Sequence, residues 1–288
     1  MPRPPLQALR LRRARLEASF AGRCVTSFAE LQGIDRAMSI ASQAFTAMIP
    51  LLILLSAALP TGSGNAVGES IIRRFQLVGA AARSVRMVFD QPESASLGLG
   101  SLLLLVFSGV SLTRRLQRMY LAAYGVEARP GVRSSISAAL GLGALLVEIT
   151  LLYMLWTLVQ TFPFHWVLGG PVSVVASIGV WTSVPWLLLD RRIPWPRLLP
   201  AGVLVGTASA LYGVATTVYM QRLITSYLQR YGLFGVTVAL VGWLLCVSFI
   251  VVATTVVAAE LDRAPERWAG RLRARLGAES GADLTRSG

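Results

Sequence analysis

One acidic residue stands in a long apolar stretch, where an ionised side chain is costly. Glu148 is flanked on both sides by leucine, valine and isoleucine. An ionised side chain at the centre of a membrane-spanning helix costs about 2.5 kcal/mol or more on insertion scales, so Glu148 is expected to face other helices, a cavity or a partner. Two interpretations stay open: a proton or cation relay or substrate contact, and a protonated or hydrogen-bonded carboxyl that holds helices together.

Two other apolar stretches carry polar side chains at helical spacing, so that each set falls on one helix face. Such a face either lines a polar cavity or makes hydrogen bonds between helices, worth about 0.6 kcal/mol each. A proline near the middle of the first stretch removes a backbone hydrogen bond and favours a kink. The candidate functional residues of the two faces are Gln43, Pro50, Tyr212 and Thr216.

The elements that position these residues are hydrophobic blocks. The chain has 288 residues, of which 54% are hydrophobic and 14% are charged, whereas about a quarter of the residues in a soluble domain are charged. Several blocks are about 17 to 25 residues long, which is the length a helix needs to cross roughly 30 Å of hydrocarbon. We therefore predict an all-α, polytopic membrane helical bundle with six spans, over residues 38–59, 97–113, 136–160, 172–189, 198–219 and 234–259.

Charge predicts the orientation of these spans, because positively charged loops are retained in the cytoplasm. All 27 basic residues are arginines, and 21 of them fall on one side if both termini are cytoplasmic. We therefore expect a basic cytoplasmic segment over 1–37, a membrane domain over 38–260 and a flexible basic cytoplasmic tail over 261–288. Such basic segments attract anionic lipids at the cytoplasmic face, so the expected partners are the bilayer and those lipids.

The first external loop, 61–96, has apolar residues at steps of three and four between residues 67 and 89. This spacing predicts an amphipathic helix. Such a helix either lies in the outer membrane interface or covers the bundle, or it packs on its own neighbours.

Small residues recur at four-residue and three-residue steps in the last two predicted spans. Small residues let helices approach closely, so we expect packing contacts here, either within one chain or in a homo-oligomer. The candidate packing residues are Gly202, Gly206, Ala210, Ala239 and Gly242, with Gly235 at the start of the last span.

Three local motifs recur together along the chain. Residues 41–52 read ASQAFTAMIPLL, and residues 116–120 read LQRMY. The C-terminal motif consists of residues 193–195, 226–227 and 231–235, followed by a tryptophan and by Ala-Ala-Glu-Leu at 258–261. The motif positions singled out are Gln117, Tyr120, Tyr231, Gly232, Gly235, Trp243 and Glu260.

In this order, the spans, the basic termini and the motifs resemble the YihY/BrkB family of bacterial inner-membrane proteins, formerly labelled ribonuclease BN and also labelled a virulence factor. The resemblance covers nearly the whole chain. It implies a bacterial plasma membrane location and a six-helix domain but no one biochemical activity; some members of the family are thought to act in envelope or lipid export. The sequence departs from the family pattern at Ser42 and Gln43, where aromatics are common, at Gln117 in place of Asn, and at Ala258 in place of Gly.

Three functions follow as alternatives: a transporter or translocator of lipids or envelope components, a structural or assembly factor of the cell envelope without transport, and, as a remote alternative, a ribonuclease. General acid-base catalysis needs paired titratable groups and metal catalysis needs clustered ligands. The predicted loops contain no acidic cluster, and His165 is expected in an external loop over 161–171. We therefore expect no enzyme activity, cofactor, metal or nucleic-acid partner.

Overall fold

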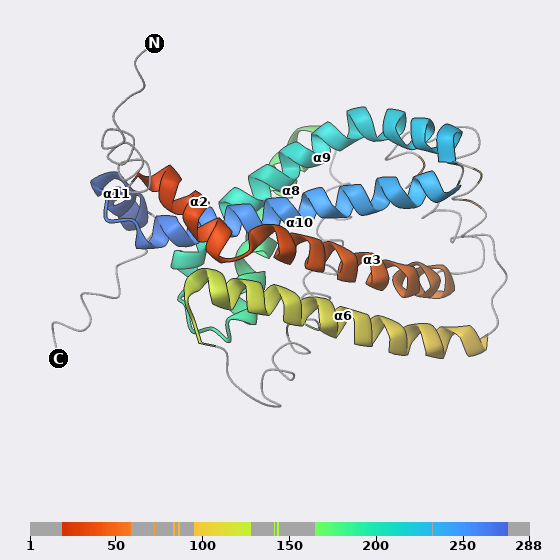
Figure 1. Ribbon diagram of the computed structural model, residues 1–288, viewed down its shortest axis with the longest axis horizontal. Coiled ribbons are helices and arrows are strands. Elements are labelled where there is room, and N and C mark those ends of the chain that lie inside the picture. Colours follow the sequence, from red (N-terminus) through yellow and green to blue (C-terminus); the bar gives the residue numbers. More distant parts are fainter. Residues whose placement is uncertain are drawn as a thin grey trace, which may run out of the picture. The chain divides into compact units, whose positions relative to one another are not determined.

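The computed structural model describes residues 19–58, 69, 72, 83, 86, 95–127, 141, 143, 165–231 and 233–275. Within these ranges every regular element is a helix, and no strand occurs (Figure 1). The helices are α2 (Phe20–Glu30), α3 (Gly33–Ala58), α6 (Ala95–Tyr124), α8 (His165–Leu188), α9 (Trp195–Tyr231), α10 (Leu233–Arg263) and α11 (Arg267–Arg275).

Five of the predicted spans overlap long helices of this structure, namely α3, α6, α8, α9 and α10. The predicted span over 136–160 lies outside the described residues except at positions 141 and 143, which are helical. Helix α8 begins at His165, so the expectation that His165 lies in a loop is wrong. The helix starts before the apolar block because hydropathy marks the apolar part of a helix and not its first turns.

Two of the described helices are long and apolar enough to cross a membrane, over Trp195–Thr216 and Thr237–Arg263. A shorter apolar helix covers Val174–Leu188. Only 33% and 28% of the two longer segments are buried, whereas the core helix of a soluble protein is mostly buried. Their apolar side chains therefore remain available to a non-aqueous environment.

The chain forms two compact units. Unit 1 comprises residues 1–36, 117–207 and 251–288, and unit 2 comprises residues 37–116 and 208–250. The predicted terminal segments 1–37 and 261–288 thus belong, almost entirely, to the same unit as parts of the predicted membrane domain.

Helices α6 and α8 in unit 1 both end in the same hydrogen-bond pattern. At the end of α6, Val126 N–H donates to the Leu121 carbonyl (2.8 Å) and Gly125 N–H donates to the Ala122 carbonyl (3.3 Å). This is a Schellman motif, which needs a left-handed residue, and Gly125 supplies it with φ of 66°. At the end of α8, Asp190 takes this position with φ of 60°.

Within unit 1, α8 and α9 pack closely because two glycines of α9 face α8. A Cβ atom at Gly202 would lie 1.9 Å from Thr182 Oγ1 and 2.8 Å from the Ile178 carbonyl oxygen. A Cβ atom at Gly206 would lie 3.2 Å from Ile178 Cγ1. These two glycines thus make a packing contact within one chain.

Within unit 2, α3 and α6 run side by side in opposite directions. Gln43 Nε2 donates to the Ser108 carbonyl at 3.5 Å, and Arg115 donates to the Ser39 hydroxyl group. The order of these contacts, rising along α3 and falling along α6, makes the pair antiparallel (Figure 1).

The predicted external loop 61–96 contributes four single described residues before α6 begins, all of them helical and all in unit 2. Ile72 is buried in a cluster with Met220 and Ile224 of α9 and Ala239 of α10. Arg86 and Glu69 form an ion pair at 2.6 Å. The amphipathic helix expected in this loop stays a prediction, because the rest of residues 61–94 lies outside the described residues.

Candidate functional site

The site is built at the ends of helices in unit 1, where α10 meets α2. Helix α2 begins at Phe20 because the side chain of Ser19 accepts a hydrogen bond from Gly22 N–H at 3.1 Å, which satisfies one of the free N–H groups at a helix start. Ser27 lies two turns further along α2 and reaches Glu260, three residues before the end of α10.

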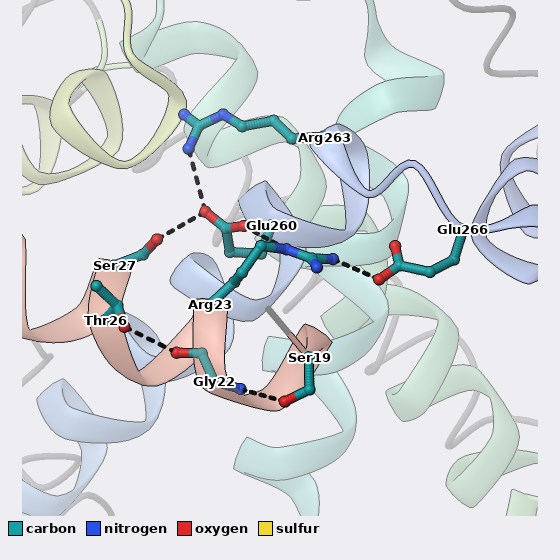
Figure 2. Close-up of polar contacts among 8 residues, drawn as sticks. All are labelled: Ser19, Gly22, Arg23, Thr26, Ser27, Glu260, Arg263 and Glu266. Carbon is teal, nitrogen blue, oxygen red and sulfur yellow. Dashed lines mark hydrogen bonds and ion pairs between the residues drawn. The ribbon is translucent and has the colours of Figure 1, made fainter. Parts of the chain in front are cut away.

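Glu260 is the centre of the polar contacts (Figure 2). Its Oε1 atom accepts a hydrogen bond from the Ser27 hydroxyl group at 2.7 Å and lies 3.4 Å from Arg263 Nη1. Its Oε2 atom lies 3.9 Å from Arg23 Nε, and Arg23 Nη2 continues to Glu266 at 2.6 Å. The Glu260 side chain is only 9% exposed, so these cationic partners and the hydroxyl group compensate a largely buried carboxylate.

Arg263 joins this carboxylate to the end of α6. Its Nη2 atom donates to the Ala123 carbonyl at 2.6 Å. Ala123 belongs to the last turn of α6, where carbonyl groups lack partners within the helix and the helix dipole is negative. One guanidinium group therefore stabilises both the end of α6 and the buried carboxylate of α10.

A second ion pair connects the start of α9 to the end of α10. Arg197 binds Asp262 in a bidentate manner, with Nε 3.0 Å from Oδ1. Tyr124 lies near this pair. Burial raises the pKa of the Tyr124 hydroxyl group well above the usual range, and the nearby Asp262 and Tyr120 raise it further. Burial likewise raises the pKa of Tyr120, against the effect of a contact with Thr255. Both tyrosines are therefore neutral at physiological pH.

Beside Glu260 lies a cavity of about 230 Å³. Its wall combines two guanidinium groups, two carboxylates and a hydroxyl group with small and branched apolar side chains. It is formed by Ser27 and Glu30 of α2, by Leu31, by Arg36 of α3, by Ala122 and Ala123 of α6, and by Val256, Glu260 and Arg263 of α10.

This arrangement suits the binding of a polar or charged group better than covalent chemistry. Burial, and then the Glu260 carboxylate, raise the pKa of the nearby Cys24 thiol, so its reactive thiolate form is scarce at neutral pH. Within the described ranges, no group of three or more His, Cys, Asp or Glu side chains is placed to hold a metal ion.

The C-terminal segment, for which we expected flexibility, is partly helical next to this site. As far as Arg275 this segment contains helix α11. Ala264 and Ala269 are buried in a cluster with Leu261, against which Phe20 of α2 packs. The Trp268 ring contacts the Phe20 ring edge-on, with centroids 5.3 Å apart.

Three of the predicted motif positions come together in unit 1. Tyr120 is fully buried, Glu260 holds the network described above, and Gln117 is buried with its Nε2 atom donating to the Leu188 carbonyl at 3.0 Å. Gln117 thereby connects α6 to the last turn of α8.

The other motif positions with described surroundings lie in unit 2. A Cβ atom at Gly235 would lie 2.2 Å from the Tyr227 carbonyl oxygen, so this position admits only glycine without a backbone shift. Trp243 packs on the Ile72 cluster, whereas Tyr231 is exposed and its ring lies 6.1 Å from that of Tyr227.

The polar faces predicted for α3 and α9 also belong to unit 2. Tyr212 OH and Tyr219 OH are 2.8 Å apart, and buried Thr216 donates to the Gly213 carbonyl of its own helix. Pro50 is buried inside α3. The contacts of Gln43 and of Tyr212 do not bring these two side chains together.

The remaining candidates differ in their surroundings. Ala239 is buried, Ala210 is exposed, and a Cβ atom added at Gly242 would meet no described atom within 4 Å. Glu148 and Gly232 lie outside the described residues.

Two partners of Glu260, Arg23 and Ser27, and two further residues of the cavity wall, Glu30 and Arg36, were not predicted as site residues. A signal was present: Phe20, Cys24, Ser27 and Leu31 recur at steps of four, three and four, which is the period of one helix face. The basic character of the N-terminal segment drew attention to its topology instead.

No curated protein and no solved structure matches the chain. A family model described as Virulence factor BrkB matches residues 24–276, which is most of the chain and includes every residue that lines the cavity beside Glu260. The chain therefore belongs to the Virulence factor BrkB (YihY) family, and this family together with the two long apolar helices indicates a membrane protein.

Proposed function

We propose that the chain is a six-span protein of the bacterial plasma membrane, with both termini in the cytoplasm, that translocates a lipid or another envelope component and is not an enzyme. One observation carries this proposal. The segments whose arginine content predicts a cytoplasmic location belong to unit 1, and three of them contribute to the wall of a polar cavity there.

The contacts that support the orientation join four parts of the chain. Ser27 precedes the first predicted span, Ala123 follows the second, Arg197 follows the fourth, and Glu260 and Asp262 follow the sixth. Segments separated by an even number of crossings end on the same side of a membrane. Their meeting in one compact unit supports the even number of spans and the shared side that the arginine count predicts.

Lipid translocation, in particular, requires a polar path for the headgroup and an apolar surface for the acyl chains. The cavity beside Glu260 supplies a polar site of headgroup size. Large apolar side chains are exposed on three helices, for example Phe107 of α6, Leu211 of α9 and Phe249 of α10. Exposed apolar surface of this kind marks contact with lipid or a partner.

The test is a leaflet-exchange assay on the full chain reconstituted in liposomes. Each liposome carries a trace of phospholipid with a fluorescent headgroup or chain label, and a membrane-impermeant reductant bleaches the outer leaflet. The proposal predicts that the protected inner-leaflet signal decays faster with protein than in empty liposomes. Equal decay would refute translocation of that lipid and would favour the structural or assembly role.

Glu148→Gln in the same assay tests the intramembrane carboxylate. A relay or substrate contact predicts slower exchange in this variant at unchanged expression and elution volume. Unchanged exchange would assign Glu148 to helix packing.

A further inference from the structure

We propose that the cavity beside Glu260 binds the zwitterionic phosphoethanolamine group of a phospholipid, with Arg36 facing the phosphate and Glu30 facing the ammonium. This inference rests on the proposed function, because it names the class of lipid that is translocated. Two charged side chains of the cavity wall have no counter-charge among the described residues, and these two charges lead to the inference.

Two of the four charged side chains in the wall compensate each other. Glu260 Oε1 lies 3.4 Å from Arg263 Nη1 and accepts the Ser27 hydroxyl hydrogen, and Arg263 also donates to the Ala123 carbonyl. These groups are therefore engaged within the protein, and a ligand would gain little from displacing them.

The other two charged side chains have no oppositely charged partner in the part of the chain that is described. Arg36 donates from Nε to the Leu31 carbonyl at 2.7 Å and from Nη1 to the Arg118 carbonyl at 3.3 Å, but it contacts no carboxylate there. Glu30 is exposed and makes no ion pair there. The described wall thus presents one positive and one negative group that form no ion pair with each other. The ligand that matches both carries one charge of each sign.

The backbone contacts of Arg36 orient its guanidinium group before a ligand arrives. A planar guanidinium group is well suited to a phosphate because it offers several N–H donors in a fixed geometry. A carboxylate such as Glu30 binds a primary ammonium through charge-assisted hydrogen bonds.

The size of the cavity selects a headgroup and not a whole lipid. Sites for drug-sized ligands occupy about 300–1,000 Å³, whereas this cavity has about 230 Å³. Leu31, Ala122 and Val256 supply apolar wall on which the start of the glycerol backbone can lie.

The lining also favours a primary over a quaternary ammonium. Quaternary ammonium groups are bound by aromatic cages, and no aromatic side chain is among the described residues that line the cavity. A headgroup with a net negative charge would leave the Glu30 carboxylate without a partner and close to the phosphate. Phosphoethanolamine therefore fits better than phosphocholine or phosphoglycerol.

The experiment measures lipid binding by the full-length protein, without reference to transport. The purified protein is equilibrated with equal amounts of phosphatidylethanolamine, phosphatidylcholine and phosphatidylglycerol of identical chains, and native mass spectrometry measures the lipids retained. The expected result is a preference for phosphatidylethanolamine of about tenfold, the size associated with one charge-assisted contact. Equal retention of the three lipids would overturn the proposal.

Two variants separate the contributions of the two charges. Glu30→Gln is expected to remove the preference for phosphatidylethanolamine over phosphatidylcholine. Arg36→Gln is expected to weaken the binding of all three lipids by about tenfold, because all three carry the phosphate. Glu127→Gln and Arg222→Gln are the matched controls, since both side chains are exposed and neither is among the residues that line the cavity. An unchanged preference in Glu30→Gln, with wild-type elution and thermal stability, would overturn the proposal.

A soluble competitor distinguishes the source of the ligand. Glycerophosphoethanolamine is expected to displace the lipid, but only at concentrations well above those of the lipid itself, because it lacks acyl chains. No displacement would place lipid recognition outside this cavity and overturn the assignment. Selective binding without leaflet exchange would refute the proposed function alone, and exchange without headgroup preference would refute this inference alone.

Discussion

Replacing Glu260 by glutamine removes the charge at the centre of the network in unit 1. Breaking a fully buried pair costs about 3–5 kcal/mol, but Arg23 and Arg263 are 27% and 45% exposed, so water screens them. Because the amide oxygen of glutamine still accepts the Ser27 hydrogen bond, we expect a loss of about 1–2 kcal/mol. Thermal unfolding of the purified protein, followed by tryptophan fluorescence, is expected to show a midpoint lower by about 4 °C.

Glu266→Gln is the matched control for this change. It removes a carboxylate that pairs with the same Arg23, but its side chain is 28% exposed, so the loss is expected to stay below about 1 kcal/mol. A double-mutant cycle of Ser27→Ala and Glu260→Ala measures the coupling free energy between the hydroxyl group and the carboxylate. We expect this coupling to be about 1 kcal/mol or more. A midpoint for Glu260→Gln within 1 °C of the wild type, or equal to that of Glu266→Gln, would refute the view of Glu260 as the central contact.

Three further predictions follow from other contacts. Gly202→Ala is expected to destabilise the protein by about 1–3 kcal/mol, because the added Cβ would overlap Thr182. Gly242→Ala serves as the control, since a Cβ there would meet no described atom within 4 Å. Equal unfolding midpoints for the two variants would contradict the α8–α9 packing. In a Cys246→Ser background, Cys24 is expected to react slowly with a maleimide at pH 8 and faster as the pH rises, because burial and Glu260 raise its thiol pKa. Adding Glu260→Gln to that background removes one of these causes and is expected to speed the reaction, and a slower reaction would contradict the assigned charge effect. Asp262→Asn leaves Arg197 without its bidentate partner and is expected to lower the unfolding midpoint more than Asp190→Asn at the exposed end of α8 does.

The positions of the long helices could be predicted because each contains a long apolar block. Their ends could not, since a helix continues beyond its apolar part until a capping residue stops it. Helix α6 continues eleven residues past the predicted end at Thr113 and stops at the Schellman motif of Gly125. Helix α11 was not predicted because its short, arginine-rich sequence carries too little apolar character to stand out. Helix α2 was not predicted because it is short and lies in a segment whose arginines were interpreted only as a sign of topology.

The site was predictable only in part. Glu260 was singled out as a motif position, but its partner Ser27 lies 233 positions away, and one sequence does not reveal which distant segments meet. The sequence also does not reveal which backbone carbonyl groups Arg36 and Arg263 contact, because every residue has a carbonyl group.

The most direct test of the account is the side of the membrane on which the Glu260 network lies. Single cysteines are placed at Glu127, next to the end of α6, and at Arg230, near the end of α9, in a background without Cys24 and Cys246. A membrane-impermeant maleimide is then applied to right-side-out spheroplasts. If the Glu260 network is cytoplasmic, Arg230→Cys is labelled at once and Glu127→Cys is labelled only after permeabilisation. Labelling of Glu127→Cys in intact spheroplasts, with Arg230→Cys protected, would contradict it.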